Sequence, residues 1–323
     1  MHSILFGPEA ELRRAIGEEQ PRIEVLDAPV GIGNDEEPAR AVRAKPESSI
    51  VQAAKALADG RADAVVTPGS TGAALAAGLF HVKRLPGVHR PAVAVLLPVP
   101  GRATLFLDAG ANVEVRPEQL VQFAHMGAAF GEGVLGLARP SVGLLSVGEE
   151  RGKGTPQVAA AHAALLESGL NFVGNVEGGD VVGGEVDVVV TDGFTGNVTL
   201  KAIEGTVRTV GGALRDAVYS GTLSKIGGLL LRPKLRRLRD EMDPETVGGA
   251  YLLGLRGLVV ICHGSSSRRA IARGIELAER GVAQRVVEKT AEALASQAGE
   301  SASDRAAEPS PSSVNADTVR ARP

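Results

Sequence analysis

The sequence predicts an α/β protein of three layers, in which helices cover both faces of a mostly parallel sheet. Two observations support this expectation. Short runs of consecutive apolar, often β-branched residues recur along the chain, as in strands that are buried on both faces. Segments with helical periodicity lie between them, and strands that alternate with helices in this way form parallel sheets. We expect one such domain over residues 1–298.

The N-terminal part of the chain predicts two short strands and two helices. The strands are Ile4–Gly7 and Ile23–Leu26, with a helix over Glu9–Glu18 between them. The segment Gly31–Lys45 is polar and lacks a clear period, so we expect an exposed loop there. A second helix follows over Ser48–Asp59, where apolar residues recur at helical spacing behind a serine that suits an N-cap.

Further strands follow, and most of them end in a turn rich in Gly, Ser, Thr and Asn. The expected strands are Ala62–Val66, Ala92–Pro98, Ala103–Leu107, Val142–Leu145, Phe172–Val176, Val186–Val190 and Leu258–Ile261. One helix follows the first of these strands and ends at Phe80. The other helices begin at about Pro117, Pro156, Val198 and Arg268. In parallel sheets such turns gather at one edge, and helix N-termini attract anions. We therefore expect all these turns to line a single anion-binding crevice.

Two segments stand apart from this pattern. Residues 220–243 combine an apolar patch with many bases, which is typical of a helix packed on the domain, of a membrane or acidic-partner contact, or of a dimer interface. Residues 299–323 are rich in Ser, Ala, Pro and charge, so we expect a disordered tail. The apolar patch of the first segment consists of Ile226, Leu229, Leu230, Leu231 and Leu235, and its bases are Lys225, Arg232, Lys234, Arg236, Arg237 and Arg239.

Composition argues against several classes of protein. The net charge is −3, aromatic residues make up 3 %, and there is no Trp, which does not suit a nucleic-acid binder. The single cysteine, Cys262, excludes a disulfide framework and favours a reducing cytoplasm. Residues 1–7 do not resemble a signal peptide, and no apolar run approaches the roughly 20 residues of a membrane span.

The common nucleotide-binding motifs fail in detail. Gly148–Thr155 resembles the phosphate-binding loop of NTPases, but the spacing is one residue short, and Gly154 follows Lys153 where Ser or Thr would bind Mg²⁺. No strand is followed by the Gly-x-Gly-x-x-Gly of dinucleotide sites together with a suitable acidic residue. No spacing of His, Cys and carboxylates indicates a metal site. We expect neither a metal nor a cofactor.

Several residues at the strand ends allow two interpretations each. His263 is either a satisfied core or capping histidine, or a donor or acid/base group at the crevice. Cys262 beside it is expected to be buried and unreactive. Lys153 either binds phosphate or an acidic partner, or is solvated. Four strand-end carboxylates act as bases or ligands, or only form caps and turns, namely Asp108, Glu149, Glu177 and Asp192.

Six stretches together resemble the PlsX family of bacterial phosphate acyltransferases, in order and in spacing. The stretches are Thr67–Ala73, Leu107–Asn112, Gly143–Gly154, Asn171–Gly178, Thr191–Asn197 and His263–Ser266. The resemblance covers about residues 4–295. It implies a three-layer α/β/α fold similar to isocitrate and isopropylmalate dehydrogenases and to phosphotransacetylases.

The resemblance implies an acyltransferase that moves a fatty acyl group from acyl carrier protein to inorganic phosphate. The product is an acyl phosphate for phospholipid synthesis. The resemblance also implies a homodimer in the cytoplasm, attached peripherally to the inner face of the cell membrane, where a glycerol-3-phosphate acyltransferase acts next. It favours a membrane contact through Ile226, Leu229, Leu230 and Leu231. The alternatives are another phosphate acyltransferase or a dehydrogenase of the same fold, and a non-catalytic adaptor for the carrier protein or membrane.

This chemistry agrees with the residue types. Phosphate dianion is itself a nucleophile, so the site has to hold it beside a thioester carbonyl and stabilise the oxyanion. We expect Lys153 and His263 to act on the transferring group as catalytic residues. The substrate-binding residues that we expect are Ser70, Thr71, Gly72, Asp108, Asn112, Glu149, Asn175, Glu177, Asp192, Thr195, Gly196, Asn197, Gly264 and Ser265.

The family also predicts a strand and an Asp-Ala-Met-Gly-Gly-Asp turn ahead of the segment that matches Ile4–Gly7. The given sequence does not contain them. One interpretation is a start placed downstream of the natural one. The other is a chain without one strand and one wall of the crevice, which would leave an exposed sheet edge.

Overall fold

A computed structural model describes residues 1–18, 20–99, 102–242 and 248–307. Its centre is a sheet of eight strands in the order β3-β10-β9-β4-β5-β8-β6-β7. The strands are β3 Ala64–Pro68, β4 Ala92–Val99, β5 Arg102–Leu107, β6 Val142–Leu145, β7 Phe172–Val176, β8 Val188–Val190, β9 Ala250–Leu253 and β10 Leu258–Cys262. Every strand expected for this sheet is confirmed, and β9 is an additional one.

The sheet consists of two parallel parts that run in opposite directions. Strands β3 and β10 are parallel to each other, as are β5, β8, β6 and β7. Between the two parts, β9 pairs antiparallel with both β10 and β4, and β4 pairs antiparallel with β5. The expectation that all the turns share one sheet edge is therefore wrong. The turns after β3 and β10 leave the strands in the direction opposite to those after β5, β6, β7 and β8.

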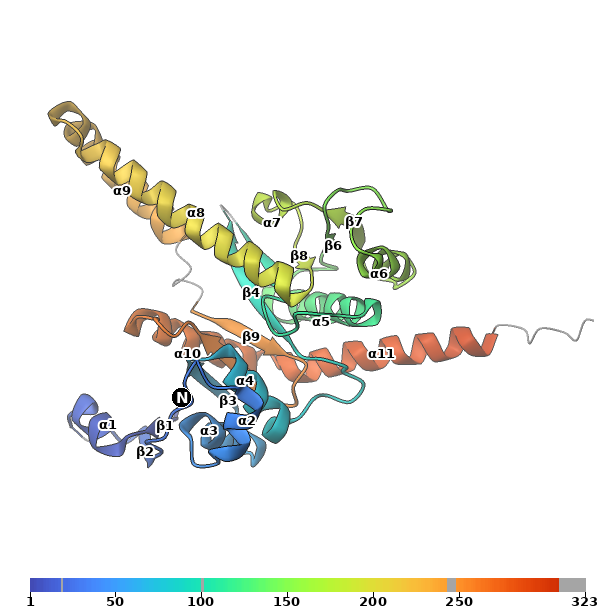
Figure 1. Ribbon diagram of the computed structural model, residues 1–323, viewed down its shortest axis with the longest axis horizontal. Helices are drawn as coiled ribbons and strands as arrows, with labels where there is room; N and C mark the ends of the chain where they lie inside the picture. Colours follow the sequence, from blue (N-terminus) through green and yellow to red (C-terminus); the bar gives the residue numbers. More distant parts are fainter. Residues whose placement is uncertain (19, 100–101, 243–247, 308–323) are drawn as a thin grey trace, which may run out of the picture.

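Helices cover both faces of the sheet, as predicted (Figure 1). One apolar cluster joins the sheet to α5 Pro117–Leu135, α6 Pro156–Leu166, α10 Arg268–Ala283 and α11 Val286–Ala307. The cluster on the other face joins it to α2 Pro38–Ala44, α3 Ser49–Ala58, α4 Thr71–Ala77, η1 Gly78–Val82, α7 Asp180–Gly183 and the start of α8 Gly193–Tyr219. The architecture is thus three-layered and mixed α/β.

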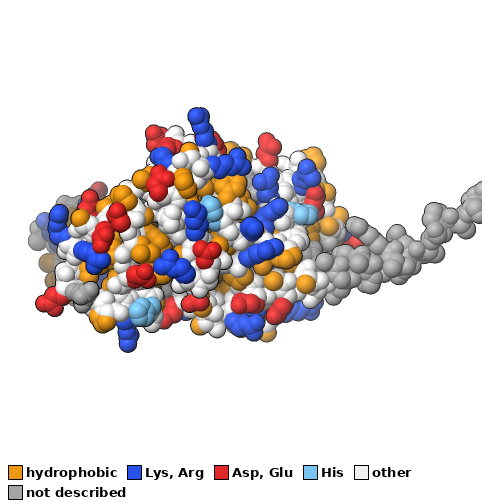
Figure 2. Space-filling view, turned by 90° about the horizontal axis from the view of Figure 1, so that it is seen from below, with side chains coloured by type: hydrophobic (Ala, Val, Ile, Leu, Met, Phe, Trp, Pro, Cys, Tyr) orange, Lys and Arg blue, Asp and Glu red, His pale blue; other side chains and the backbone are white. Residues whose placement is uncertain are grey.

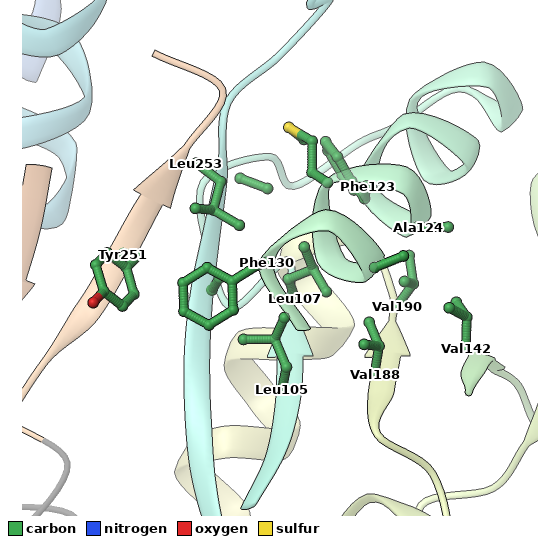
Figure 3. Packing of buried hydrophobic residues seen from close by; sticks show 14 of the residues in the cluster. Leu105, Leu107, Phe123, Ala124, Phe130, Val142, Val188, Val190, Tyr251 and Leu253 are labelled. Atoms are coloured by element: carbon green, nitrogen blue, oxygen red, sulfur yellow. The ribbon is translucent and has the colours of Figure 1, made fainter. Parts of the chain in front are cut away.

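Aromatic packing fixes part of the first cluster. Phe130 of α5 meets Tyr251 of β9 edge to face, with ring centroids 4.9 Å apart (Figure 3). Leu105 and Leu107 of β5, which are fully buried, lie beside the Phe130 ring. The Tyr251 hydroxyl donates a 2.5 Å hydrogen bond to the Leu277 carbonyl oxygen, so the polar end of this core residue is satisfied.

The N-terminal strands are confirmed, but they form a separate sheet. β1 Ser3–Gly7 and β2 Ile23–Asp27 pair in parallel, and α1 Glu9–Ile16 connects them. Part of the expected loop 31–45 is instead helix α2. The Glu37 side chain accepts hydrogen bonds from the backbone N–H groups of Ala39 and Arg40, and Pro38 begins the helix. This N-terminal capping allows a helix to form although the apolar residues show no helical spacing.

Helices α8 and α9 Thr222–Met242 form a hairpin that projects away from the sheet (Figure 1). Pro233 lies inside α9, so the proline does not divide this segment into two helices. The expected start of a tail at residue 299 falls within α11, so residues 299–307 continue that helix. Residues 308–323 of the predicted tail lie outside the described residues.

Candidate functional site

The turn after β5 is built around the buried carboxylate of Asp108. Its Oδ1 accepts from the backbone N–H groups of Val93 at 3.0 Å, Gly110 at 3.1 Å and Ala111 at 2.9 Å. Its Oδ2 accepts from the backbone and side-chain nitrogens of Asn112 at 2.7 and 2.8 Å. Burial raises the pKa of the Asp108 carboxyl, and these donors oppose that shift. Asp108, which is 0 % exposed, thus shapes the turn from within.

The N-terminus of α8 follows β8 and lies beside this turn. The Asp192 side chain caps the helix, accepting from the Thr195 backbone N–H at 2.9 Å and from the Thr195 hydroxyl at 2.7 Å. The positive dipole end of this 27-residue helix lies beside the turn, and the backbone N–H groups of Gly193, Thr195 and Gly196 are bonded within the protein. The Asn197 side-chain amide and the positive dipole end of the helix therefore suit an anion, whereas the Thr195 hydroxyl is bonded to Asp192.

Two glycines allow α8 to approach the Asp108 turn. A β-carbon on Gly193 would lie 2.6 Å from the backbone oxygen of Asn112, and one on Gly196 would overlap the backbone oxygen of Asp108. The Gly193 N–H also donates to the Asn112 oxygen at 2.7 Å. Asn197 lies next to Gly110, whose φ is 135°. The turns after β5 and β8 are therefore one packed unit.

The turn after β6 carries Lys153 and is largely exposed. The Lys153 stem lies near Gly148, since a β-carbon on Gly148 would be 3.1 Å from Lys153 Cγ. Gly154 adopts φ 99° and faces the Ser146 hydroxyl, so only glycine fits there. Thr155 then caps α6 by accepting from the Val158 N–H at 3.3 Å. Glu149 is exposed in the same turn.

Strand β7 contributes one buried and one exposed predicted residue. Asn175 is 5 % exposed, and its Nδ2 donates to the backbone oxygen of Glu150 at 3.0 Å. Its Oδ1 lies 2.9 Å from Nδ1 of His162 on α6. Glu177 is exposed, and its backbone N–H donates to the Asp180 carboxylate at 2.7 Å. The prediction included Asn175 and missed His162, which the sequence shows only as a polar residue within an apolar helix.

The turns after β3 and β10 form a second group of predicted residues. Ser70 caps α4, accepting from the Ala73 N–H at 3.3 Å, and Thr71 and Gly72 are half-buried behind it. His263, Gly264 and Ser265 are exposed after β10. Because strands β3 and β10 run opposite to β6, the structure assigns Lys153 and His263 to different groups of turns.

The exposed His263 ring has one nitrogen engaged locally. Its Nδ1 accepts from the Ser265 backbone N–H at 3.2 Å and lies 2.7 Å from the Ser265 hydroxyl. A backbone N–H can only donate, so the neutral ring carries its proton on Nε2. Cys262 precedes it, is buried, and has a pKa raised by burial.

The surface charge and the types of polar group limit the kinds of ligand that these turns suit. Figure 2 shows acidic and basic side chains interspersed over one face of the molecule, in keeping with the small net charge of −3. Within the described part of the chain, no group of three or more His, Cys, Asp or Glu side chains is arranged to hold a metal ion. The polar groups that do converge are N–H donors, hydroxyls and amides, which suit an anion.

Comparisons with known proteins agree on one family. The sequence model of a family described as "Fatty acid synthesis protein" matches residues 1–289. A phosphate acyltransferase of Geobacillus sp. (strain WCH70) is 47 % identical over 295 residues, covering 91 % of this chain and 89 % of the relative. One of Brevibacillus brevis is 44 % identical over 293 residues, covering 90 % of this chain and 88 % of the relative.

Solved structures agree on the fold. A phosphotransacetylase from Streptococcus pyogenes has a TM-score of 0.52 and 17 % identity, covering 90 % of this chain and 85 % of that one. The EutD phosphotransacetylase from Staphylococcus aureus has a TM-score of 0.50 and 18 % identity, covering 90 % and 86 %. At such low sequence identity, these structures show only that the fold is similar. The match over residues 1–289 and the identities above 40 % show that this chain belongs to the phosphate acyltransferase family, a family of acyltransferase enzymes.

Proposed function

We propose that this protein transfers a fatty acyl group from acyl carrier protein to inorganic phosphate. A phosphate oxygen attacks the thioester carbonyl, the C–O bond forms, the C–S bond breaks, and the carrier thiol leaves as thiolate and takes up a proton. The products are an acyl phosphate for phospholipid synthesis and free carrier protein. The observation that carries the proposal is the N-terminus of α8 packed on the Asp108 turn, at the same sheet edge as the Lys153 turn.

Phosphate binding at this edge is supported by the donors found there. The positive dipole end of α8 favours an anion there, and the Asn197 side-chain amide offers N–H donors. The Thr195 hydroxyl and the backbone N–H groups of Gly193, Thr195 and Gly196 already donate within the protein. Lys153 is exposed on a turn one strand away, and among the described residues no carboxylate forms an ion pair with it. Its ammonium group is therefore available to the phosphate or to the developing oxyanion.

Direct attack by phosphate is supported by the state of the single cysteine thiol, which lies at the end of β10 in the other group of turns. Cys262 is 1 % exposed, and burial raises the pKa of its thiol, so little thiolate forms. A covalent acyl-cysteine step therefore has no ready nucleophile at this position. The carboxylate of Asp108 is occupied by five N–H donors, which assigns it to shaping the turn that receives the substrate.

The second group of turns is proposed to contact the donor rather than the phosphate. The thioester is carried on a long pantetheine arm, which is able to contact two groups of turns at once. His263 presents its Nε2–H outward, and Ser70, Thr71 and Ser265 offer hydroxyls in the same group. We assign His263 to the pantetheine arm of the donor, away from the carbonyl that the phosphate attacks.

The test measures acyl phosphate formed from palmitoyl carrier protein and phosphate. Lys153→Ala should lower the rate at low phosphate, and the matched control Arg151→Ala removes an exposed charge from the same turn with little effect. His263→Ala should weaken use of the carrier-bound donor, with His89→Ala as its control. Normal rates for both Lys153→Ala and His263→Ala would reject the assignment of these residues. Carrier binding without any acyl phosphate would instead identify an adaptor.

Membrane contact is proposed for the α8–α9 hairpin. Leu223, Ile226, Leu229 and Leu230 are 87, 57, 65 and 77 % exposed. The bases of this segment with described side chains include Lys225, Arg232, Lys234 and Arg236, all exposed, which suits an anionic lipid surface. Among the residues that the structure describes, no helix has both the length and the apolar character needed to cross a membrane.

We propose peripheral attachment to the inner face of the cell membrane, as a homodimer that supplies the glycerol-3-phosphate acyltransferase. Burying one exposed leucine in lipid contributes about 1.5–3 kcal/mol. Changing Leu229, Leu230 and Leu231 to Ser should therefore abolish flotation with phosphatidylglycerol vesicles. The control changes three exposed apolar residues elsewhere to Ser, namely Leu166, Val173 and Val182. Undiminished flotation of the hairpin variant would reject the contact.

A further inference from the structure

A buried histidine that the proposed reaction does not use lies under the Lys153 turn. His162 of α6 is 4 % exposed, and its ring meets Phe172 edge to face with centroids 5.1 Å apart. Its Nδ1 lies 2.9 Å from Oδ1 of Asn175. Its Nε2 is buried and has no hydrogen-bond partner. A buried polar atom without a partner costs stability, so the presence of this ring points to a role for its other nitrogen, Nδ1.

The neighbouring bonds determine which ring nitrogen carries the proton. Asn175 donates from Nδ2 to the backbone oxygen of Glu150 at 3.0 Å. A carbonyl oxygen only accepts, so the amide cannot be flipped, and Oδ1 must face His162. His162 therefore donates from Nδ1–H, and Nε2 is the unprotonated nitrogen. The imidazole fixes the orientation of the Asn175 amide.

The Glu150 oxygen links this pair to Lys153. It also accepts a hydrogen bond from the Lys153 backbone N–H at 2.9 Å. The Glu150 carbonyl oxygen thus accepts one hydrogen bond from the buried Asn175 side chain and one from the backbone N–H of Lys153 in the same turn. Glu150 and Lys153 are exposed, whereas Asn175 and His162 are buried, so the anchor of this exposed turn lies in the core.

We propose that His162 is a positioning residue for the transfer reaction. Through the Asn175 amide and the Glu150 carbonyl, it fixes the backbone at Lys153 and so the origin of the lysine side chain. His162 itself touches no substrate. The effect on catalysis rests on the proposed function. The hydrogen bonds that link His162 to Lys153 do not, because they belong to the folded protein itself.

Amide hydrogen exchange at Lys153 tests the chain without any substrate. His162→Phe keeps a ring against Phe172 but removes the donor, and exchange at Lys153 should become about five- to tenfold faster, as expected for one lost hydrogen bond. His162→Asn places an amide N–H where Nδ1 was, and should restore slow exchange. Asn175→Ala removes the anchor without altering α6, and it should act like His162→Phe even if the latter folds poorly. Unchanged exchange at Lys153 in both His162→Phe and Asn175→Ala would overturn the proposal.

Acyl phosphate formation then tests the consequence in catalysis. His162→Phe should lower kcat while His162→Asn retains it. In the Lys153→Ala background, His162→Phe should add no further loss, because its effect passes through Lys153. Fully additive losses would contradict this route. If the unaltered protein forms no acyl phosphate, the proposed function fails, and the exchange measurement still decides the role of His162.

Discussion

Replacing Gly193 by Ala tests whether the close approach of α8 to the Asp108 turn builds the site. The new β-carbon would lie 2.6, 2.7 and 2.9 Å from three backbone atoms of Asn112, whereas real β-carbons stay beyond 3.0 Å. The helix must therefore move by roughly half an ångström. Asn112 cannot yield easily, because both its backbone N–H and its side-chain Nδ2 donate hydrogen bonds to Asp108. Such overpacking costs about 1–3 kcal/mol.

The same helix offers a matched control in Gly205. A β-carbon there would meet nothing within 4 Å, so Gly205→Ala should stabilise the helix by about 1 kcal/mol. For a chain of this size, about 2 °C in Tm corresponds to 1 kcal/mol. Thermal unfolding should then place Gly193→Ala about 2–6 °C below the unaltered protein and Gly205→Ala about 2 °C above it.

The catalytic readout separates damage to the site from simple destabilisation. Gly193→Ala shifts the N-terminal N–H groups of α8 away from the Asp108 turn, so the KM for phosphate should rise at temperatures where the variant remains folded. Gly205→Ala should leave this KM unchanged. A Gly193→Ala protein with the original Tm and KM would refute the claim that these two turns are one packed unit.

Two further predictions concern buried titratable groups. Burial lowers the pKa of His125 to about 4 from 6.5, so its neutral form stabilises the fold fully above pH 6.5 and that stability is lost as the pH falls toward 4. The shift corresponds to about 3 kcal/mol, and His125→Leu should flatten the decline in Tm between pH 7 and pH 4.5; an equally steep decline would contradict this. Burial also raises the pKa of the Cys262 thiol, so labelling by a thiol reagent at pH 8 should be far slower than after unfolding in urea, and comparable rates would show that the thiol is accessible.

The strands and the fold class were predictable because apolar runs and turn residues are local signals. The direction of the strands was missed, although the sequence carries a clue to it. Only Gly254–Gly257 separates β9 from β10, and only Pro100 and Gly101 separate β4 from β5. Connections this short join antiparallel strands, since a parallel crossover needs a dozen or more residues. Recognising them would have divided the turns into two groups.

The buried contacts of the site were less accessible from sequence. Asp108 was expected among the substrate-binding residues, and as a strand-end Asp it was also recognised as a possible turn former. Only the structure shows five N–H donors around it. His162 gave no signal, because a lone polar residue in an apolar helix does not reveal the partner on another element. Long-range pairs such as His162 and Asn175 depend on β7 and α6 packing together.

The reversal of the sheet bears on what kind of substrate this fold can serve. If all the turns met at one edge, one compact substrate site there would account for the predicted residues. Instead, β9 and β4 separate the turns after β3 and β10 from those after β5, β8, β6 and β7. One group is held by Asp108 and the α8 N-terminus, and the other presents His263 and the Ser70 cap. We therefore infer that a long donor such as a carrier-bound thioester contacts both groups of turns, whereas phosphate contacts only the first.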